Sequence, residues 1–332
     1  MRKLVISVTI LITQLCCFAQ APAGYYDSAL GLSGDNARSA LYNIINSHTT
    51  IAYDNIWGYF NNTDITGGIV TDIYSTYSYT FNTDQCGQYS AEGDCYNREH
   101  SVPQDWFNGS SPMYSDLFHI YPTDGFVNGQ RSNLPYGEVG SATYTSTNGC
   151  KKGNNIYPGY SGTVFEPADD YKGDLARTYF YVATRYMNVA AGWTGESFQG
   201  NTLTNWTLNM MVGWHQNDPV SQKEIDRNNT IYTIQGNRNP YIDHPNWVNR
   251  VFIWPTSVVA IKDQKNKLWY SNNSIHFDSR TKSESPLLIY DSLGKLISSN
   301  TISQGINSYQ INLTPGIYFA TYQNTQLKLV VL

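Results

Sequence analysis

One stretch of the chain, Asn97–Glu138, contains the chemical groups that phosphodiester hydrolysis needs. That reaction uses a base that removes a proton from water, a cation that neutralises the phosphoryl and leaving oxygens, and a donor to the charged transition state. His100 has a ring nitrogen that is mostly unprotonated near neutral pH and can serve as the base. Glu99 and Asn128 offer the hard oxygen ligands that Mg²⁺ prefers, and Arg131 is a nearby donor. The stretch therefore predicts a hydrolytic centre with a bound cation.

The adjacency of Glu99 and His100 restricts the element that can carry them. Neighbouring side chains on a regular strand point to opposite faces, so both can address one site only where the strand ends or bulges. Pro103, three residues later, fits a strand that ends there. Asn128 must then come from a following element, most simply a short helix that begins near Asp124 or Gly125.

The sequence around these residues resembles the core of the secreted endonuclease I family, whose members are ββα-metal (His-Me finger) nucleases. The likeness is carried by NREHSVPQDWF, which starts at Asn97, and by DLFHIYPTDGFVNGQRSNLPYGEV, which starts at Asp116. It extends to FEPADDYKGDLARTYFYVATRY and to DPVSQKEIDRN with QGNRNPYIDHP, and it covers Tyr25–Trp254.

This resemblance implies a role for each matching residue. The family's general-base histidine falls on His100, and its metal-ligating glutamate and asparagine fall on Glu99 and Asn128. It also implies Mg²⁺ as the cofactor, which Mn²⁺ or Ca²⁺ can replace in binding. The expected substrate is DNA, with RNA as a second substrate, cut with little sequence preference to leave 5′-phosphate and 3′-hydroxyl ends.

A helix predicted over Gly173–Asn188 adds a further catalytic candidate, Arg177. The helix has one apolar stripe, and Arg177 and Arg185 fall together on another face. Guanidinium groups on that face could bind phosphates in a bidentate manner. The alternative is a pair of solvated or salt-bridged arginines, and the sequence leaves both open.

Other polar residues of the resembling segments favour structural roles or stay undecided. His119 is expected to be structural or to orient a ligand. Glu166 and Asp174 either pair with the arginines or support the metal. A later group either locks the core or contacts substrate; its members are Arg227, Arg238 and His244.

Composition excludes a generally basic nucleic-acid binder. The 332 residues are 41% apolar and 14% charged, with a formal net charge of -5. An acidic chain gains nothing from global electrostatics toward a polyanion, so binding of nucleic acid must rest on a local basic surface and on a bound cation.

The first residues have the pattern of a secretory leader. Arg2 and Lys3 precede the apolar run Leu4–Leu15, and Cys17–Ala19 forms a small-x-small cleavage site, so residues 1–19 are predicted to be a signal peptide. An uncleaved anchor is the alternative, but the run is too short to span a bilayer. The mature protein is therefore expected to be secreted and to have no membrane span.

Three cysteines lie beyond the predicted leader. Cys86 and Cys95 flank a glycine-containing loop and are the best candidates for a disulfide in an oxidising compartment. With Cys150 the number is odd, and three unpaired cysteines are the alternative.

The fold class predicted from these patterns is α+β, with a His-Me finger (ββα-metal) core, added helices and a small all-β sandwich at the C-terminus. The expected domains are a catalytic domain at 24–258, a polar linker at 259–274 and the sandwich at 275–332, with five short strands. The sandwich resembles the sorting domains that secreted proteins present to the type IX secretion machinery. A carbohydrate-binding or structural β-domain is the alternative.

Two other classes of function compete with a secreted nuclease. Abundant aromatic residues and the β-rich tail would also suit an adhesin-like protein that binds glycans or DNA without cutting them. A metalloprotease is a weaker option, because the chain has no H-E-x-x-H motif.

Overall fold

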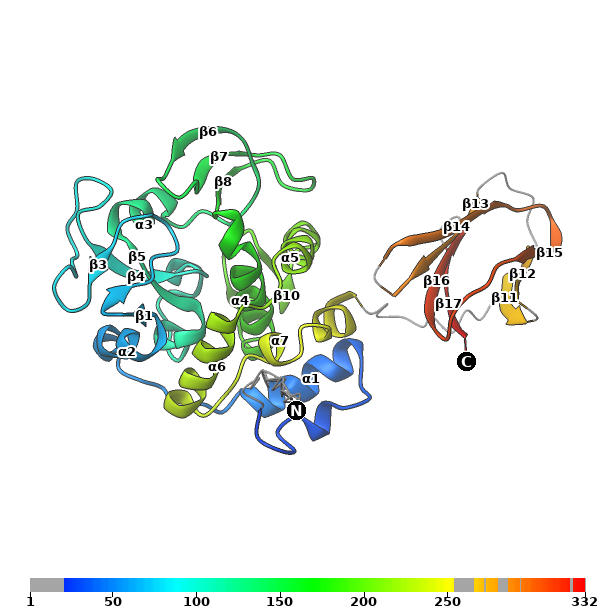
Figure 1. Cartoon of the computed structure of the whole chain (residues 1–332), viewed down its shortest axis with the longest axis horizontal. Coiled ribbons are helices and arrows are strands. Elements are labelled where there is room, and N and C mark those ends of the chain that lie inside the picture. The colour runs from blue at the N-terminus through cyan, green and yellow to red at the C-terminus, as the bar shows by residue number, and fades with distance from the viewer. Residues whose placement is uncertain are drawn as a thin grey trace, which may run out of the picture. The chain divides into compact units, whose positions relative to one another are not determined.

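The computed structural model describes residues 21–253, 266–271, 273–279, 286–292, 294–322 and 325–331. The chain divides into two compact units, Met1–Thr256 and Ser257–Leu332 (Figure 1). The predicted leader and the first part of the predicted linker lie outside the described residues. In the part of the chain that is described, no helix is long and apolar enough to cross a membrane.

The first unit is organised around one helix, α4 (Lys172–Arg185), which packs against α5 and against α1 (Figure 1). Twelve of its 14 residues are buried, so it is covered on all sides and not along one stripe only. The other helices are α1 (Gly34–Ile45), α2 (Ile56–Thr63), α3 (Gly125–Arg131), α5 (Asn205–Asn217), α6 (Gln222–Gln235) and the single turn α7 (Pro240–Asp243).

Short 3₁₀ turns connect many of these elements, and a π-helical turn follows α7. The 3₁₀ turns are η1 (Asp27–Ala29), η2 (Tyr53–Asn55), η3 (Gln104–Phe107), η4 (Met113–Ser115), η5 (Leu117–His119), η6 (Asp169–Tyr171) and η7 (Ala190–Gly192), and the π-helical turn is η8 (Asn249–Ile253).

The strands of the first unit form small antiparallel sheets. β4 (Tyr96–His100) pairs with β5 (Ile120–Asp124), and α3 follows directly, so that two strands and a helix form one compact unit. The remaining strands are β1 (Ile65–Thr66), β2 (Ile69–Val70) and β3 (Tyr79–Thr80) in one sheet, β6 (Val139–Thr145), β7 (Lys151–Asn155) and β8 (Thr163–Glu166) in a second, and β9 (Phe198–Gln199) and β10 (Thr202–Leu203) in a third.

The junction between β5 and α3 is fixed by Asp124. Its carboxylate accepts a hydrogen bond from the backbone N–H of Val127 at 3.0 Å and so caps α3, as aspartate does well at this position. It also accepts from the Tyr79 hydroxyl at 2.5 Å and from the backbone N–H of Gly93 at 2.7 Å. A helix was predicted to begin at this point, and the structure confirms it.

The predicted disulfide between Cys86 and Cys95 is present, and Cys150 is a buried free thiol. Cys95 is next to the first residue of β4. The bridge therefore ties the loop that precedes β4 to the strand itself.

The second unit is all-β. One sheet has the strand order β11-β12-β15 and the other has the order β14-β13-β16-β17. Apolar side chains from both sheets, among them Phe277, Ile289 and Tyr322, form its core. The strands are β11 (Asn266–Ser271), β12 (Ser274–Ser279), β13 (Pro286–Asp291), β14 (Leu296–Thr301), β15 (Gly305–Gln310), β16 (Gly316–Tyr322) and β17 (Thr325–Val331).

The predicted linker and the prediction of five strands need correction here. β11 lies inside the range expected for the linker, and β11 and β12 add two strands to the five expected. The polar composition of this stretch hid the strands, because β11 pairs with β12 and β12 pairs with β15 through backbone hydrogen bonds, which do not depend on the side chains.

Candidate functional site

A polar pocket of about 280 Å³ lies where β4 ends. Glu99 and His100 are the last two residues of β4, and Asn128 comes from α3. The three side chains that the sequence singled out for base and metal roles therefore line one pocket. The residues that surround them are Tyr53, Tyr89, Asn97, Arg98, Pro103, Gln104, Arg131, Ser132 and Asn133.

Glu99 is 2% exposed, and its two oxygens differ in their contacts. Oε1 accepts a hydrogen bond from the Tyr74 hydroxyl at 2.9 Å and lies 2.8 Å from Nη1 of Arg131. Among the described residues, Oε2 has no hydrogen-bond partner. Burial raises the pKa of Glu99 to about 7, although Arg131 and Tyr74 both lower it.

His100 is held as a neutral imidazole of one tautomer. Its Nε2 lies 3.1 Å from the backbone carbonyl of Tyr114, and because a carbonyl can only accept, Nε2 carries the proton. Nδ1 therefore keeps its lone pair, and no residue in the described ranges hydrogen-bonds to it. Burial, together with the nearby His119, lowers the pKa of His100 to about 3, so the ring stays uncharged near neutral pH.

Two tyrosine rings fix the plane of the His100 ring. Its centroid lies 5.5 Å from that of Tyr114 and 5.7 Å from that of Tyr53, each with an interplanar angle of 16°. His100 and Glu99 thus contact different neighbours, as strand alternation requires. Both reach the pocket because β4 ends at His100, as the sequence predicted.

Asn128 has a free oxygen. Its Nδ2 makes a long contact of 3.5 Å with the carbonyl of Arg98, and its Oδ1 accepts no hydrogen bond from a described residue. Glu99 Oε2 and Asn128 Oδ1 are thus two uncommitted oxygens in one pocket. Nowhere among the described residues, this pocket included, do three His, Cys, Asp or Glu side chains gather where they could hold a metal ion, so a cation here would depend on one carboxylate and one amide oxygen. A hard cation held by two side chains and by water is the usual arrangement for Mg²⁺.

Arg131 belongs to the pocket, but both of its terminal nitrogens, Nη1 and Nη2, are occupied. Nη1 donates to the carbonyl of His100 at 2.7 Å and forms the ion pair with Glu99, and Nη2 donates to the carbonyl of Ser101. The side chain is 1% exposed. The expectation that Arg131 donates to a phosphate is therefore corrected: its guanidinium is bound to the end of β4 and to Glu99.

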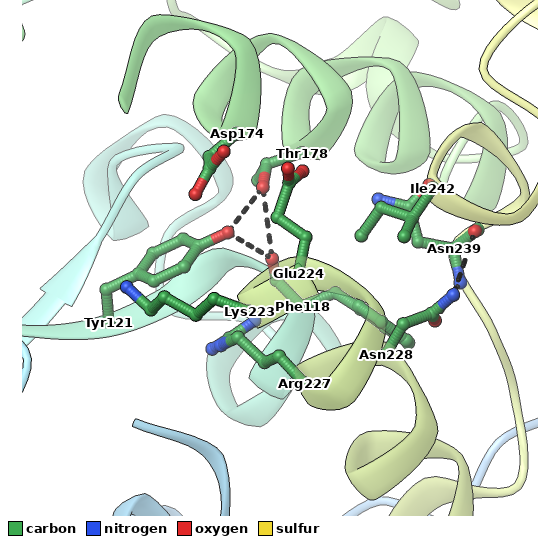
Figure 2. Close-up of a pocket in the computed structure, with 10 residues that line it drawn as sticks. All are labelled: Phe118, Tyr121, Asp174, Thr178, Lys223, Glu224, Arg227, Asn228, Asn239 and Ile242. Carbon is green, nitrogen blue, oxygen red and sulfur yellow. Dashed lines mark hydrogen bonds between the residues drawn. The ribbon is translucent and has the colours of Figure 1, made fainter. Parts of the chain in front are cut away.

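Arg177 does not belong to the pocket, which corrects the second catalytic candidate. It is fully buried, donates to Glu224 at 2.5 and 2.8 Å, and lies 3.2 Å from Asp174. Asp174 and Glu224 line a small cavity of about 10 Å³. Figure 2 shows these two side chains on neighbouring helices, α4 and α6. The reason is that α4 is buried on all sides, so its arginine-bearing face meets protein and not solvent.

The other polar residues of these segments serve the core. His119 is buried and its Nε2 donates to the Met113 carbonyl at 2.7 Å, which agrees with a structural role. Asp174 pairs with Arg177, one of the alternatives left open. Glu166 pairs with Lys172 at 2.7 Å and with Lys151 at 3.7 Å, Arg227 pairs with Asp64 at 2.9 Å, and Arg238 pairs with Asp243 at 2.7 Å.

Several contributors to the pocket were missed by the sequence analysis. Tyr74 is fully buried and bonds both to Glu99 and, at 2.6 Å, to the Tyr136 hydroxyl. The guanidinium of Arg98 lies 3.7 Å from the centroid of the Tyr53 ring. Arg98 stands within the quoted motif and could have been proposed from it. With 27 tyrosines in the chain, no local signal distinguishes Tyr74 from the others.

Comparison with known families gives two matches to this chain. The endonuclease I model matches residues 33–246, which include all the pocket residues named above. A model for a secretion system C-terminal sorting domain matches residues 271–331.

Individual relatives cover much of the same region. An extracellular ribonuclease of Bacillus subtilis (strain 168) is 32% identical over 244 residues, which are 70% of this chain and 78% of that protein. An extracellular ribonuclease of Bacillus amyloliquefaciens is 33% identical over 69% of this chain and 78% of its own length. An extracellular deoxyribonuclease of Aeromonas hydrophila is 25% identical over 44% of this chain and 55% of its own length.

Proposed function

The chain belongs to the endonuclease I family and is a secreted nuclease, and from this premise we propose that it is a magnesium-dependent endonuclease of the His-Me finger type with its catalytic centre at the end of β4. The observation that carries the proposal is the pocket in which Glu99, His100 and Asn128 meet. The β4–β5 pair followed by α3 supports the ββα assignment.

His100 acts as the general base in this proposal. Its Nδ1 removes a proton from a water molecule, whose oxygen attacks the phosphorus. The bond between phosphorus and the 3′-oxygen breaks, that oxygen takes a proton from solvent water and leaves as a 3′-hydroxyl, and the other product carries a 5′-phosphate. His100 then returns its proton to solvent. The hydrogen bond from Nε2 to Tyr114 suits this role, because it keeps the ring oriented and stabilises the imidazolium that forms.

Glu99 and Asn128 would hold a Mg²⁺ ion, for which Oε2 and Oδ1 are available. Both oxygens lack a partner among the described residues, and a buried carboxylate whose pKa is raised gains strongly from a nearby cation. When bound there, Mg²⁺ neutralises the phosphoryl charge and stabilises the leaving oxygen. Mn²⁺ and Ca²⁺ are expected to bind in its place.

Arg131 and Tyr74 act on Glu99 and not on the substrate. They fix Oε1, which leaves Oε2 available for a cation, and outer-shell contacts of this kind set the affinity of a metal site. We assign Arg131 as a positioning residue for this reason.

We propose DNA as the substrate and RNA as a second substrate, with little sequence preference. The relatives named above are called deoxyribonuclease and ribonuclease, which supports activity on either polymer. We further propose that the C-terminal unit directs export by the type IX secretion machinery, on the basis of its match to a sorting domain.

Cleavage of plasmid DNA by the full chain tests the proposal. H100A should abolish cleavage while Mn²⁺ binding, measured by calorimetry, persists. EDTA should stop the wild-type reaction and added Mg²⁺ should restore it. H244A is the matched control, because His244 packs on Trp247 and does not line the pocket. Undiminished cleavage by H100A would remove His100 from the mechanism.

The same assay distinguishes a nuclease from an adhesin-like binder, the alternative that the comparisons do not favour. A protein that only binds DNA retards the plasmid band but does not shorten it with time.

A further inference from the structure

A second pocket of the first unit, of about 540 Å³, is here named the Arg185 pocket. Residues from α1, from the end of α4, from η7 and from the segment after η3 line it. Its volume is in the range of sites that bind small molecules, roughly 300–1,000 Å³, and it is large enough for one nucleotide unit.

Arg185 lies in this pocket without a counter-charge. The side chain is 7% exposed, Nε donates to Nδ1 of His48 at 3.1 Å, and the guanidinium lies 4.6 Å from the centroid of the Tyr186 ring. Across the described ranges, its Nη1 and Nη2 have no hydrogen-bond or ion-pair partner. Nη1 and Nη2 of Arg185, and the positive charge that they carry, therefore have no partner among the described residues at this pocket.

The other buried arginines of the first unit have partners of the kind that Arg185 lacks. Each of four has a carboxylate between 2.5 and 2.9 Å away: Arg131, Arg177, Arg227 and Arg238. Arg38 instead donates to two backbone carbonyls. A buried charge without a partner is energetically costly. An anion that enters the Arg185 pocket would supply the negative charge that no described carboxylate places beside this guanidinium.

Asp116 is the nearby carboxylate that could have neutralised Arg185, but its oxygens are engaged elsewhere. They accept hydrogen bonds from the hydroxyls of Tyr181 and Tyr186 at 2.8 and 2.7 Å, and from Gln235 at 3.0 Å. Asp116 is completely buried and does not line the pocket.

The wall of the pocket is aromatic. The rings of Phe107 and Trp193 lie 5.6 Å apart, and Trp193 keeps part of its surface exposed. Nucleic-acid bases stack on such rings with little dependence on sequence. Asn108 and Asn188 on the rim are exposed and polar.

The Arg185 pocket and the catalytic pocket are neighbours through η3. Gln104, at the start of η3, lines the catalytic pocket, and Phe107, at its end, lines the Arg185 pocket. The Phe107 ring lies 6.2 Å from the ring of His100. Phe107 therefore lines the Arg185 pocket and also packs beside the ring of the proposed general base.

We propose that the Arg185 pocket is a nucleotide subsite for the substrate strand. A phosphate away from the scissile bond accepts hydrogen bonds from Nη1 and Nη2 of Arg185, and the attached base lies on the wall formed by Phe107 and Trp193. This inference rests on the proposed nuclease function and adds a binding site to it.

The test compares a 12-nucleotide strand with a minimal diester, thymidine 5′-p-nitrophenyl phosphate, which is too short to span both pockets. In the H100A background, R185M should raise the Kd of the 12-mer about ten-fold and should reduce the slope of log K against log salt by about 0.7. In the active chain, R185M should lower the ratio of kcat/KM for the 12-mer to that for the diester.

A second variant keeps the test decisive if R185M does not fold. N188D places a carboxylate on the exposed rim and should also weaken binding of the 12-mer. N217D is its matched control, because Asn217 is exposed, ends α5 and lines neither pocket. Both variants change the net charge equally.

Three other results would be informative in different ways. If N188D and R185M bind the 12-mer like the parent while the wild type still cuts DNA, the subsite is wrong and the nuclease function stands. If the wild type cuts nothing, the nuclease function fails, and the Kd values still decide the subsite. If R185M alters only inhibition by inorganic phosphate, the pocket binds free phosphate and the strand assignment is overturned.

Discussion

Replacement of Arg177 by methionine tests whether this arginine has a structural or a catalytic role. Nε and Nη2 of Arg177 bind Glu224, Nη1 donates to the backbone carbonyl of Asp218 at 2.8 Å, and no part of the side chain is exposed. R177M removes the positive charge and leaves Glu224 and Asp174 buried near each other. Burial and the nearby Glu224 already raise the pKa of Asp174 to about 7 with the arginine present.

The expected loss of stability is large. Removal of one partner from a buried ion pair costs about 3–5 kcal/mol, because the other charge stays buried without compensation. For a domain of this size each kcal/mol lowers Tm by about 2–4 °C, so R177M should lower the Tm of the first unit by roughly 6–20 °C. The double variant R177M/E224Q should recover part of this loss, because it also removes a stranded charge.

Thermal unfolding followed by circular dichroism measures the loss, and plasmid cleavage at 20 °C measures the activity. We expect R177M to keep the activity of the wild type per folded molecule, to within about two-fold, because Arg177 lies outside the catalytic pocket. A normal Tm combined with a hundred-fold loss of kcat would refute this reasoning and would return Arg177 to the catalytic machinery.

Three further predictions concern the metal site and the stability of the first unit. Y74F removes the hydrogen bond to Glu99 Oε1 and should weaken Mg²⁺ binding at least ten-fold, as seen by calorimetry, while the fold is retained. D116N should destabilise the unit by about 3 kcal/mol, measured by urea unfolding, because an amide nitrogen would face buried donors. Burial alone would raise the pKa of Asp116, but two histidines and several hydrogen bonds lower it to about 2. The ionised carboxylate therefore contributes roughly 2–3 kcal/mol to the free energy of unfolding above about pH 4, and this contribution is lost as the pH falls toward 2. D116N should remove this acid dependence. The double variant C86S/C95S should lose about 2.5 kcal/mol, the value for a loop that joins residues 9 apart, and an unchanged unfolding midpoint would show that the bridge does not stabilise the unit.

The sequence predicted those parts of the site that depend on local rules. Strand alternation and Pro103 required β4 to end at the Glu99–His100 pair, and the Asp124 cap located the start of α3. The disulfide followed from a short loop between two cysteines. Each of these features is decided within a few residues of the chain.

The sequence could not predict contacts between distant segments. Tyr74 reaches Glu99 from 25 residues away, and nothing near position 74 specifies that contact. Arg177 was misplaced because helical periodicity identifies the most apolar face but not whether the opposite face is also covered. β11 was missed because backbone pairing in a sheet does not need an apolar pattern.

The register of β4 against β5 explains why the neighbouring residues Glu99 and His100 lie in different electrostatic surroundings. Glu99 pairs with Tyr121 and His100 pairs with Ile120, so alternation sends the carboxylate toward Arg131 and the imidazole toward the aromatic rings. Burial acts on both, but it raises the pKa of the acid and lowers that of the histidine. In the proposed mechanism both shifts are useful, since one increases the gain from a bound cation and the other keeps the base unprotonated. A shift of one residue in this register would place the imidazole beside Arg131 and the carboxylate among aromatic rings, and neither group could then perform its role.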